Sequence, residues 1–275
     1  KAYYAKLGYW NEIKGWHIDR IKDFINKIQP YILKRSNDDV GRVLPKTNIQ
    51  NHWLELTPGQ QLVYNDLKAK SKLTVSVNGT TYSQMISVLT RLRETCDFAD
   101  LGDPQAPSSS SKLTALLYLV KATPPGEKTI IFTQWEQAVQ RISARLNQEG
   151  LTNILISGKV KGTHRHDAIK EFQHSPNINI LVTTDCLSYG LNMAFANHMI
   201  LFDLVFTPAR TTQRVGRIRR LGQTKDMTIH SLLCRNTIEE RIMNILSAKQ
   251  GMVDTLFDPT EQNIKLTSDD LKRII

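Results

Sequence analysis

Short apolar runs alternate with amphipathic stretches along the second half of the chain. The runs are rich in β-branched residues, which is typical of buried strands, and the stretches between them space their apolar residues as a helix does. Strands that alternate with helices predict right-handed crossovers and a mostly parallel sheet with helices on both faces. Strands are expected at Thr129–Phe132, Ile154–Ile156, Ile178–Val182, Met199–Phe202 and Met227–Leu233, and helices at Trp135–Gln148, His164–Gln173 and Ala209–Arg219.

The first half of the chain has a helical pattern instead. Apolar residues recur at helical spacing over residues 18–28, and Pro30 ends that pattern. Thr57 precedes Pro58, which places a good N-cap before a proline at the first helical position. A further helix is expected over Tyr82–Thr95. We therefore expect helical elements before the α/β region.

Prolines and serines gather in residues 103–111, which read DPQAPSSSS. Such a composition offers few apolar groups to anchor the backbone and predicts a flexible linker. We therefore expect a helical part over residues 51–102, an α/β domain over residues 112–249 and a C-terminal extension over residues 250–275.

The charge of the chain favours a polyanionic partner. The 275 residues carry a formal net charge of +10 with a pI near 9.5, which suits the phosphate backbone of nucleic acid, although solubility alone is the other interpretation. Cys96, Cys186 and Cys234 lie far apart with no histidine at zinc-ligand spacing, so neither a disulfide framework nor a metal site is expected. No apolar run approaches the ~20 residues that cross a bilayer, so we expect no membrane and an intracellular location. The chain opens at Lys1 in what reads as mid-domain sequence, and we expect it to be a piece of a longer protein.

Four arginines crowd the segment from Gln213 to Gln223. Like charges at this density repel one another unless an anion lies between them. Arg217 and Arg220 are three residues apart, so on a helix they would share one face and could bind one triphosphate together. The alternatives are a solvated basic face and a contact with the phosphates of DNA.

A second polar segment, Thr183 to Asn192, follows the expected strand that ends near Val182. Ligands of parallel sheets bind at the carboxyl ends of the strands, and hydroxyls and free backbone N–H groups there suit a phosphate. Gly190 would allow the backbone to approach a ligand closely. An ordinary turn between a strand and a helix is the other interpretation of this segment.

The arginine segment resembles a known motif. Its pattern Q-x-x-G-R-x-x-R is similar to motif VI of superfamily 2 helicases, and the Leu-Gly-Gln that follows resembles the ending of the motif in Swi/Snf-related members. The resemblance implies that Arg217 and Arg220 act as arginine fingers, which stabilise the charge on a transferring phosphoryl group. It also implies that Gln213 lies at the nucleotide.

The other polar segment resembles motif V of the same family, S-T-x-A-G-G-x-G-I-N. The resemblance implies that Thr183 and Thr184 lie near the DNA backbone, and that Gly190 and Asn192 lie near the nucleotide cleft. Residues 187–188, Leu-Ser, replace the glycine pair of the motif, so the local loop geometry departs from the family pattern.

Further blocks match the family in the same order. Thr129 to Trp135 resembles motif IV and implies a phosphate contact for Gln134, and Gly158 to Phe172 resembles the next block and implies a DNA contact for Arg165. The remaining matches are PYILKR at 30–35, LTP at 56–58, LRETC at 92–96 and TIEE at 237–240, so the resemblance covers residues 28–249. It implies that residues 1–50 are the end of a first motor lobe with its connector, that residues 51–102 are a helical protrusion, and that residues 112–249 are a second, RecA-like lobe.

The phosphate loop G-x-x-x-x-G-K-[ST] and the Mg²⁺-binding D-E-x-H motif are missing from the sequence. The resemblance thus implies that ATP with Mg²⁺ is bound mainly by an N-terminal motor lobe outside this chain, that the isolated chain hydrolyses ATP poorly, and that the joined lobes translocate along double-stranded DNA. Nucleosomes or RNA polymerase are the expected protein partners; the segment from Asp203 to Pro208 lacks the Trp-Asn of eukaryotic remodellers and is more similar to bacterial relatives that act on RNA polymerase. The location would be the nucleus in a eukaryote and the cytoplasm or nucleoid otherwise. A strand-separating helicase lobe and a non-catalytic DNA-binding module remain the alternatives.

Overall fold

The computed structural model describes residues 5–7, 13–16, 20, 23, 27, 45–78, 82–160, 162–187, 192–205 and 208–256. The chain divides into two compact units, Lys1–Leu44 and Pro45–Ile275. In the first unit β1 (Ala5–Leu7) pairs antiparallel with β2 (Ile13–Trp16), a hairpin that the apolar pattern does not predict. The expected connector at residues 30–45 lies almost wholly outside the described residues.

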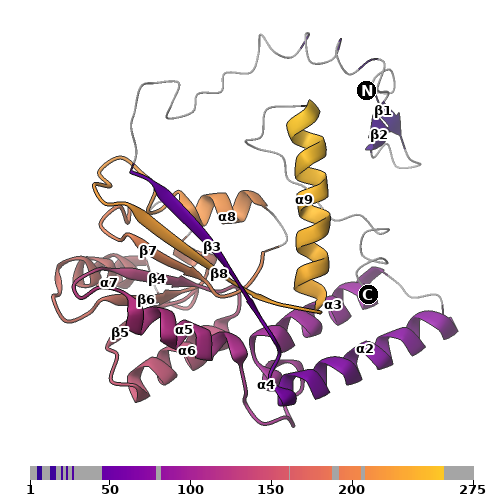
Figure 1. The fold of residues 1–275 in the computed structure, drawn as a ribbon, viewed down its shortest axis with the longest axis horizontal. Coiled ribbons are helices and arrows are strands. Elements are labelled where there is room, and N and C mark those ends of the chain that lie inside the picture. Colours follow the sequence, from indigo (N-terminus) through magenta and orange to yellow (C-terminus); the bar gives the residue numbers. More distant parts are fainter. Residues whose placement is uncertain are drawn as a thin grey trace. The chain divides into compact units, whose positions relative to one another are not determined.

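Six parallel strands form the sheet of the second unit, in the order β3-β8-β7-β4-β6-β5 (Figure 1). Five of them match the strands expected from the apolar runs to within two residues at each end. The edge strand β3 is an addition, because its sequence TNIQNHWL is largely polar and exposed. The bounds are β3 (Thr47–Leu54), β4 (Thr129–Phe132), β5 (Asn153–Ile156), β6 (Ile180–Thr183), β7 (His198–Leu201) and β8 (Met227–Cys234).

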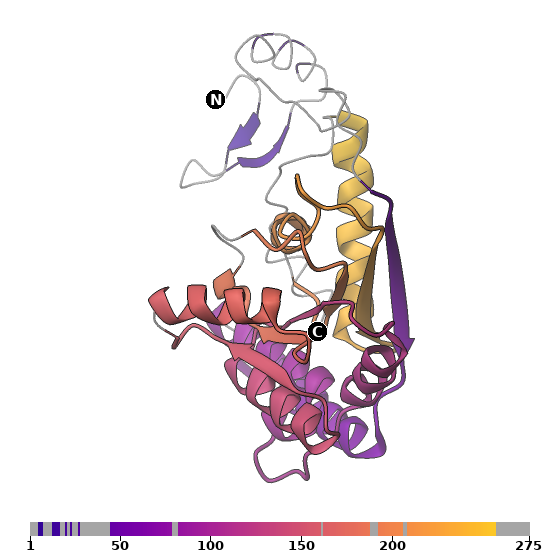
Figure 2. The ribbon, with the colours of Figure 1, turned by 90° about the vertical axis from the view of Figure 1, so that its left-hand side faces the viewer.

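Both faces of the sheet are covered by apolar side chains. Ile130 of β4 belongs to one buried cluster with Phe172 of α7 (Gly162–His174), whereas its neighbour Ile131 belongs to another cluster with Leu116 of α5 (Ser111–Ala122) and Ile142 of α6 (Glu136–Gln148). Successive residues of a strand point to opposite faces, which is why a continuous apolar run fits a sheet buried on both sides. Figure 2 shows α7 and α6 on opposite sides of the sheet. The expected α/β, RecA-like lobe is confirmed.

A third apolar cluster joins the helical part to the lobe. The helical part holds α2 (Pro58–Asn78), α3 (Tyr82–Asp97) and the short α4 (Ala99–Gly102), and the cluster joins α2 and α3 to α9 (Ile238–Leu256). Tyr64, Leu89, Ile238 and Ile242 pack together in this cluster, and the Tyr64 hydroxyl accepts the Ile238 N–H at 2.6 Å. The start of α2 is as the sequence predicts: Thr57 Oγ1 accepts the Gln60 N–H, and Gln60 Oε1 accepts the Thr57 N–H, each at 3.2 Å. None of the described helices is long and apolar enough to cross a membrane.

The serines of the expected linker take part in the packing between α2 and α5. Ser109 Oγ lies 3.0 Å from Thr57 Oγ1, Ser110 Oγ accepts the Leu113 N–H at 3.0 Å as the N-cap of α5, and the Ser111 N–H donates to Gln60 Oε1 at 3.0 Å. These bonds tie the second half of the segment to the beginning of α2. The first half, Pro104 to Ser108, is mostly exposed, and its flexibility stays a prediction.

A buried ammonium also holds the helical part against the lobe. Lys112 of α5 is fully buried, and its Nζ lies 2.8 Å from Asp97 Oδ1 of α3 and 2.6 Å from Glu239 Oε1 of α9. Burial raises the pKa of Asp97 to about 8, even though Lys112 opposes the shift. At neutral pH Asp97 is therefore protonated, and it still accepts a hydrogen bond from the Lys112 ammonium.

The raised pKa of Asp97 makes stability depend on pH. Because the folded chain holds this proton up to about pH 8 and the unfolded chain releases it near pH 4, the contribution of Asp97 is fully present below pH 4 and is lost as pH rises toward 8. We expect Asp97→Asn, which mimics the protonated form, to be tolerated best at pH 8 and to flatten the fall in stability between pH 5 and pH 8. Urea midpoints of both proteins at the two pH values measure this. A parallel fall in both proteins would contradict it.

Candidate nucleotide and nucleic-acid site

Polar residues follow three neighbouring strands at the carboxyl edge of the sheet. β4 pairs with β6 and with β7, and Phe132 at the end of β4 lies opposite Thr183 and Leu201. The polar segments after these strands, Thr133–Gln134, Thr184–Asp185 and Asp203, therefore meet at one place. This is the edge at which parallel sheets bind ligands.

The arginine segment leaves the helix earlier than the spacing argument requires. Helix α8 covers Pro208–Val215, and residues 216–222 form turns, so the expectation that Arg217 and Arg220 share one helix face is wrong. Two features end the helix: Gly216 is a poor helix former, and Ile218 turns inward and is fully buried in the core. Arg217 is half-buried, and Arg220 is exposed.

The loop of residues 216–223, which we call the arginine loop, packs against residues 193–196, which lead into β7. The Met193 N–H donates to the Arg217 carbonyl at 3.0 Å, and Gln223 Nε2 donates to the Ala196 carbonyl at 2.7 Å. Gly222 has a φ of 97°, a left-handed conformation that favours glycine, and lies beside Ala194. The arginine loop thus lies beside residues 193–196, directly after the second polar segment.

The other predicted nucleotide residues are exposed or lie outside the described part. Asn192 is exposed, and its Oδ1 accepts the Ala194 N–H at 3.2 Å, which shapes the start of the segment. Gln213 is exposed on α8, and Gly190 lies outside the described residues. The nucleotide roles of these three residues stay predictions.

The two threonines predicted to contact DNA are buried. Thr183 is fully buried, and its hydroxyl donates to the Thr184 carbonyl at 3.0 Å. Thr184 is 8% exposed, and its hydroxyl lies 3.5 Å from the Cys186 N–H, which donates to it. Their side chains thus shape the loop after β6, and a DNA contact from this loop would come from its backbone groups or from a rearrangement. Their role at DNA stays a prediction.

Gln134 and Arg165, the other predicted DNA residues, are held by protein groups. Gln134 Nε2 donates to Asp203 Oδ1 at 3.2 Å and to the Leu204 carbonyl at 3.0 Å. Arg165 Nε donates to the Val160 carbonyl at 2.8 Å, so the half-buried guanidinium steadies the loop before α7. The role of Arg165 at DNA stays a prediction.

Asp203 and Arg214 form an ionic centre that sequence analysis does not single out. Arg214 on α8 is fully buried; its Nε donates to Asp185 Oδ1 at 2.6 Å, and its Nη1 lies 3.5 Å from Asp203 Oδ1. Asp203 also accepts the Thr133 hydroxyl at 2.6 Å. Burial by itself would raise the pKa of Asp203, but Arg214 and these hydrogen bonds hold it below its usual range. The sequence contains two signs of this pair: Asp203 directly follows an expected buried strand, and Arg214 is an arginine of the motif with no assigned role.

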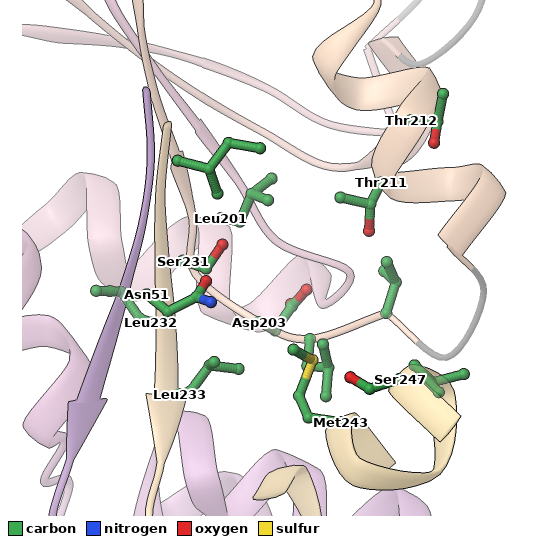
Figure 3. Close-up of a pocket in the computed structure, with 14 residues that line it drawn as sticks. Asn51, Leu201, Asp203, Thr211, Thr212, Ser231, Leu232, Leu233, Met243 and Ser247 are labelled. Atoms are coloured by element: carbon green, nitrogen blue, oxygen red, sulfur yellow. The ribbon is translucent and has the colours of Figure 1, made fainter. Parts of the chain in front are cut away.

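A cavity of about 370 Å³ lies beside this centre, between the sheet, α8 and α9 (Figure 3). Thr211 and Thr212 of α8 face Met243 and Ser247 of α9 across it, and most of its other walls are apolar. Neither Arg217 nor Arg220 lines this cavity. The arginine loop therefore lies outside this cavity.

One group of side chains in the described part brings three possible metal ligands together. Single ligand atoms of Cys96, Cys234 and Glu239 lie within 4.8 Å of one another, all buried. Lys112 Nζ already lies 2.6 Å from Glu239, and burial raises the pKa of the Cys96 thiol, which keeps it protonated. A cation is thus present as an ammonium, and the group serves packing.

Comparisons with known proteins give family matches over two parts of the chain. A family model described as Helicase conserved C-terminal domain matches residues 111–222, and one described as SNF2-related domain matches residues 11–101. An ATP-dependent helicase of Bacillus subtilis (strain 168), YqhH, is 27% identical over 84% of this chain and 44% of its own length. Transcription termination factor 2 of Drosophila melanogaster is 29% identical over 59% of this chain and 16% of its own length. The chain spans less than half the length of either relative.

Solved structures share the fold. The C-terminal part of the Fun30 ATPase domain has a TM-score of 0.66 at 17% identity and covers 84% of this chain and 96% of its own. The Sulfolobus solfataricus SWI2/SNF2 ATPase core in complex with dsDNA has a TM-score of 0.67 at 25% identity, over 92% of this chain and 56% of its own.

The fold and the family matches together define the class of protein, a helicase of superfamily 2 represented by its C-terminal lobe. The chain belongs to the Swi/Snf-related family of that class, as its sequence motifs indicate.

Proposed function

We propose that this chain is the second motor lobe of a Swi/Snf-type ATPase that couples ATP hydrolysis to translocation on double-stranded DNA. The observation that carries the proposal is the contact between the arginine loop and residues 193–196, which continue the second polar segment toward β7. It anchors the loop that carries Arg217 and the exposed Arg220, whose guanidinium groups suit phosphate. The Bacillus subtilis relative is an ATP-dependent helicase, which supports ATP use, and the Sulfolobus solfataricus structure in complex with dsDNA supports duplex DNA as the substrate.

The residues present fit one part of the nucleotide only. Arg217 and Arg220 would supply positive charge to the γ-phosphate of an ATP molecule held by the first lobe. Asp185 and Asp203, the carboxylates of this edge, both bind Arg214, so the Mg²⁺ ligands and the phosphate loop are assigned to the first lobe. When ATP draws the two lobes together, this chain contributes the guanidinium groups, and when hydrolysis releases them, its grip on DNA shifts.

Joining this chain in one polypeptide with a first motor lobe tests the proposal. We expect ATP turnover that double-stranded DNA stimulates, with no separation of a labelled duplex. Stimulated turnover together with strand separation would favour a strand-separating helicase. Absent turnover with intact DNA binding would favour a non-catalytic DNA-binding module.

DNA binding by the chain alone should depend strongly on salt. Its net charge of +10 attracts phosphates without reading bases, and bound cations are released from DNA when the protein binds. We expect weak affinity that falls by roughly tenfold or more between 50 and 200 mM salt. Fluorescence anisotropy on two duplexes of equal length and different sequence measures it. Equal affinity at both salt concentrations, or a clear preference for one sequence, would contradict the prediction.

A further inference from the structure

Asp203 and Leu204, the second and third residues after β7, bind both the segment after β4 and α3. Asp203 accepts hydrogen bonds from the Thr133 hydroxyl at 2.6 Å and the Gln134 N–H at 2.5 Å, which fixes the segment after β4. Leu204 offers its carbonyl to Gln134 Nε2 at 3.0 Å and to Arg93 Nη2 at 2.6 Å. Arg93 is 5% exposed and comes from α3, so the protrusion reaches the same point.

Arg214 extends these connections to the loop after β6 and to the arginine loop. Its guanidinium lies between Asp203 and Asp185, and its backbone carbonyl accepts the Arg217 N–H at 3.1 Å. The side chain of Arg214 thus contacts Asp185 after β6 and Asp203 after β7. The backbone of Arg214 binds Arg217, the first of the two predicted arginine fingers. A shift of α8 moves all of these groups together.

A buried guanidinium between two carboxylates makes this connection stiff. Separating Arg214 from Asp203 would leave a buried carboxylate without the guanidinium beside it, which is costly. The stack of the Arg214 guanidinium over the Phe132 ring, with 5.5 Å to the ring centroid, further limits its positions. The segments it joins should therefore change position as one body.

We propose that Arg214 is a positioning residue that couples the arginine loop to the segments after β4 and β6, so that contact with DNA sets the placement of Arg217 and Arg220. This inference rests on the proposed function and names its regulation. Asp203 transmits the position of the Thr133–Gln134 segment, and Asp185 transmits that of the loop after β6. Arg214 itself is fully buried, so it acts through these two carboxylates.

The test compares DNA-stimulated and basal ATP turnover in the polypeptide that joins this chain to a first lobe. The ratio of the two rates, at saturating ATP and DNA, is independent of the fraction of folded protein, because misfolding lowers both rates by the same factor. We expect Arg214→Lys to lower this ratio by about tenfold or more, within the usual range of coupling between sites, and to leave the KM for ATP within a few-fold.

Two further variants keep the inference falsifiable. Asp185→Asn removes one partner of Arg214 from a carboxylate that is 26% exposed, so folding should survive, and it should lower the ratio in the same direction. Arg141→Lys is the matched control, because Arg141 binds Asp100 at 2.7 Å in a similar pair on the α6 side of the sheet. It should leave the ratio unchanged.

The outcomes separate the inference from the proposed function. An unchanged ratio in both Arg214→Lys and Asp185→Asn would overturn the inference, as would an equal fall in Arg141→Lys. A wild-type polypeptide whose turnover DNA does not stimulate would overturn the proposed function and the inference with it. A fall confined to Arg214→Lys and Asp185→Asn supports coupling through Arg214.

Discussion

Replacing Arg220 with alanine should lower ATP turnover by ~10³-fold or more in a polypeptide that contains both motor lobes, in line with other arginine fingers. The side chain is exposed on the arginine loop and free of the buried ionic centre that Arg214 forms, so its loss should leave the fold intact. The affinity for DNA should stay within a few-fold. Steady-state turnover at saturating DNA, with a separate binding titration, measures both effects.

Arg219→Ala is the matched control for this prediction. Arg219 is the neighbouring exposed residue, and its loss changes the net charge by the same amount. Both residues lie in the turns after α8, and what distinguishes them is the motif: Arg220 occupies the position of an arginine finger, and Arg219 does not. We expect Arg219→Ala to change turnover only slightly. If Arg220→Ala instead abolished DNA binding with turnover per bound complex intact, the arginine loop would be a phosphate clamp.

The sheet was predictable because its strands are buried on both faces. Runs such as Ile130–Phe132 and Met199–Phe202 place apolar residues at every position, and a parallel strand between two helical layers requires this. The strand β3 was not predictable, because an edge strand pairs with one neighbour only and can keep polar, exposed side chains. Its pairing with β8 is a long-range contact that a local pattern does not contain.

The candidate site was predictable as a set of segments and less so as side chains. Parallel topology brings the ends of β4, β6 and β7 together whatever residues follow them, so the meeting of Thr133, Thr184 and Asp203 follows from the fold. Which hydroxyl faces solvent does not follow. Thr183 ends a strand with its side chain in the core, and its motif resemblance carries no information on that direction.

The end of α8 shows the same limit. Helical spacing predicts one face for Arg217 and Arg220, but the burial of Ile218 in the core turns the chain after Val215. A tertiary contact here overrides the local periodicity. Arg214 shows a similar limit. In the sequence it is one of four neighbouring arginines, and only the fold brings Asp185 and Asp203 to it.

The buried ammonium of Lys112 should matter more to stability than any other single charge outside the site. Lys112→Met keeps the length of the side chain but leaves Glu239 and Asp97 in the core without their cation. Removing one partner of a buried ion pair typically costs about 3–5 kcal/mol, and we expect the free energy of unfolding to fall by about that amount. Urea unfolding followed by circular dichroism measures it, with an unchanged slope as the sign that the folded state is preserved.

Lys121→Met is the control on the same helix. Lys121 pairs with Glu149 at 2.7 Å, but the two side chains are 53% and 26% exposed, so water replaces the lost partner and stability should change little. The double variant Lys112→Met with Glu239→Gln should recover part of the loss, because it removes the unpaired carboxylate as well. The recovery should be partial, since Glu239 Oε2 also accepts the Cys234 N–H at 2.9 Å. If Lys112→Met were no more destabilising than Lys121→Met, the buried network would contribute nothing to holding α3 and α9 together, and the apolar cluster around Tyr64 and Ile242 would carry that junction alone.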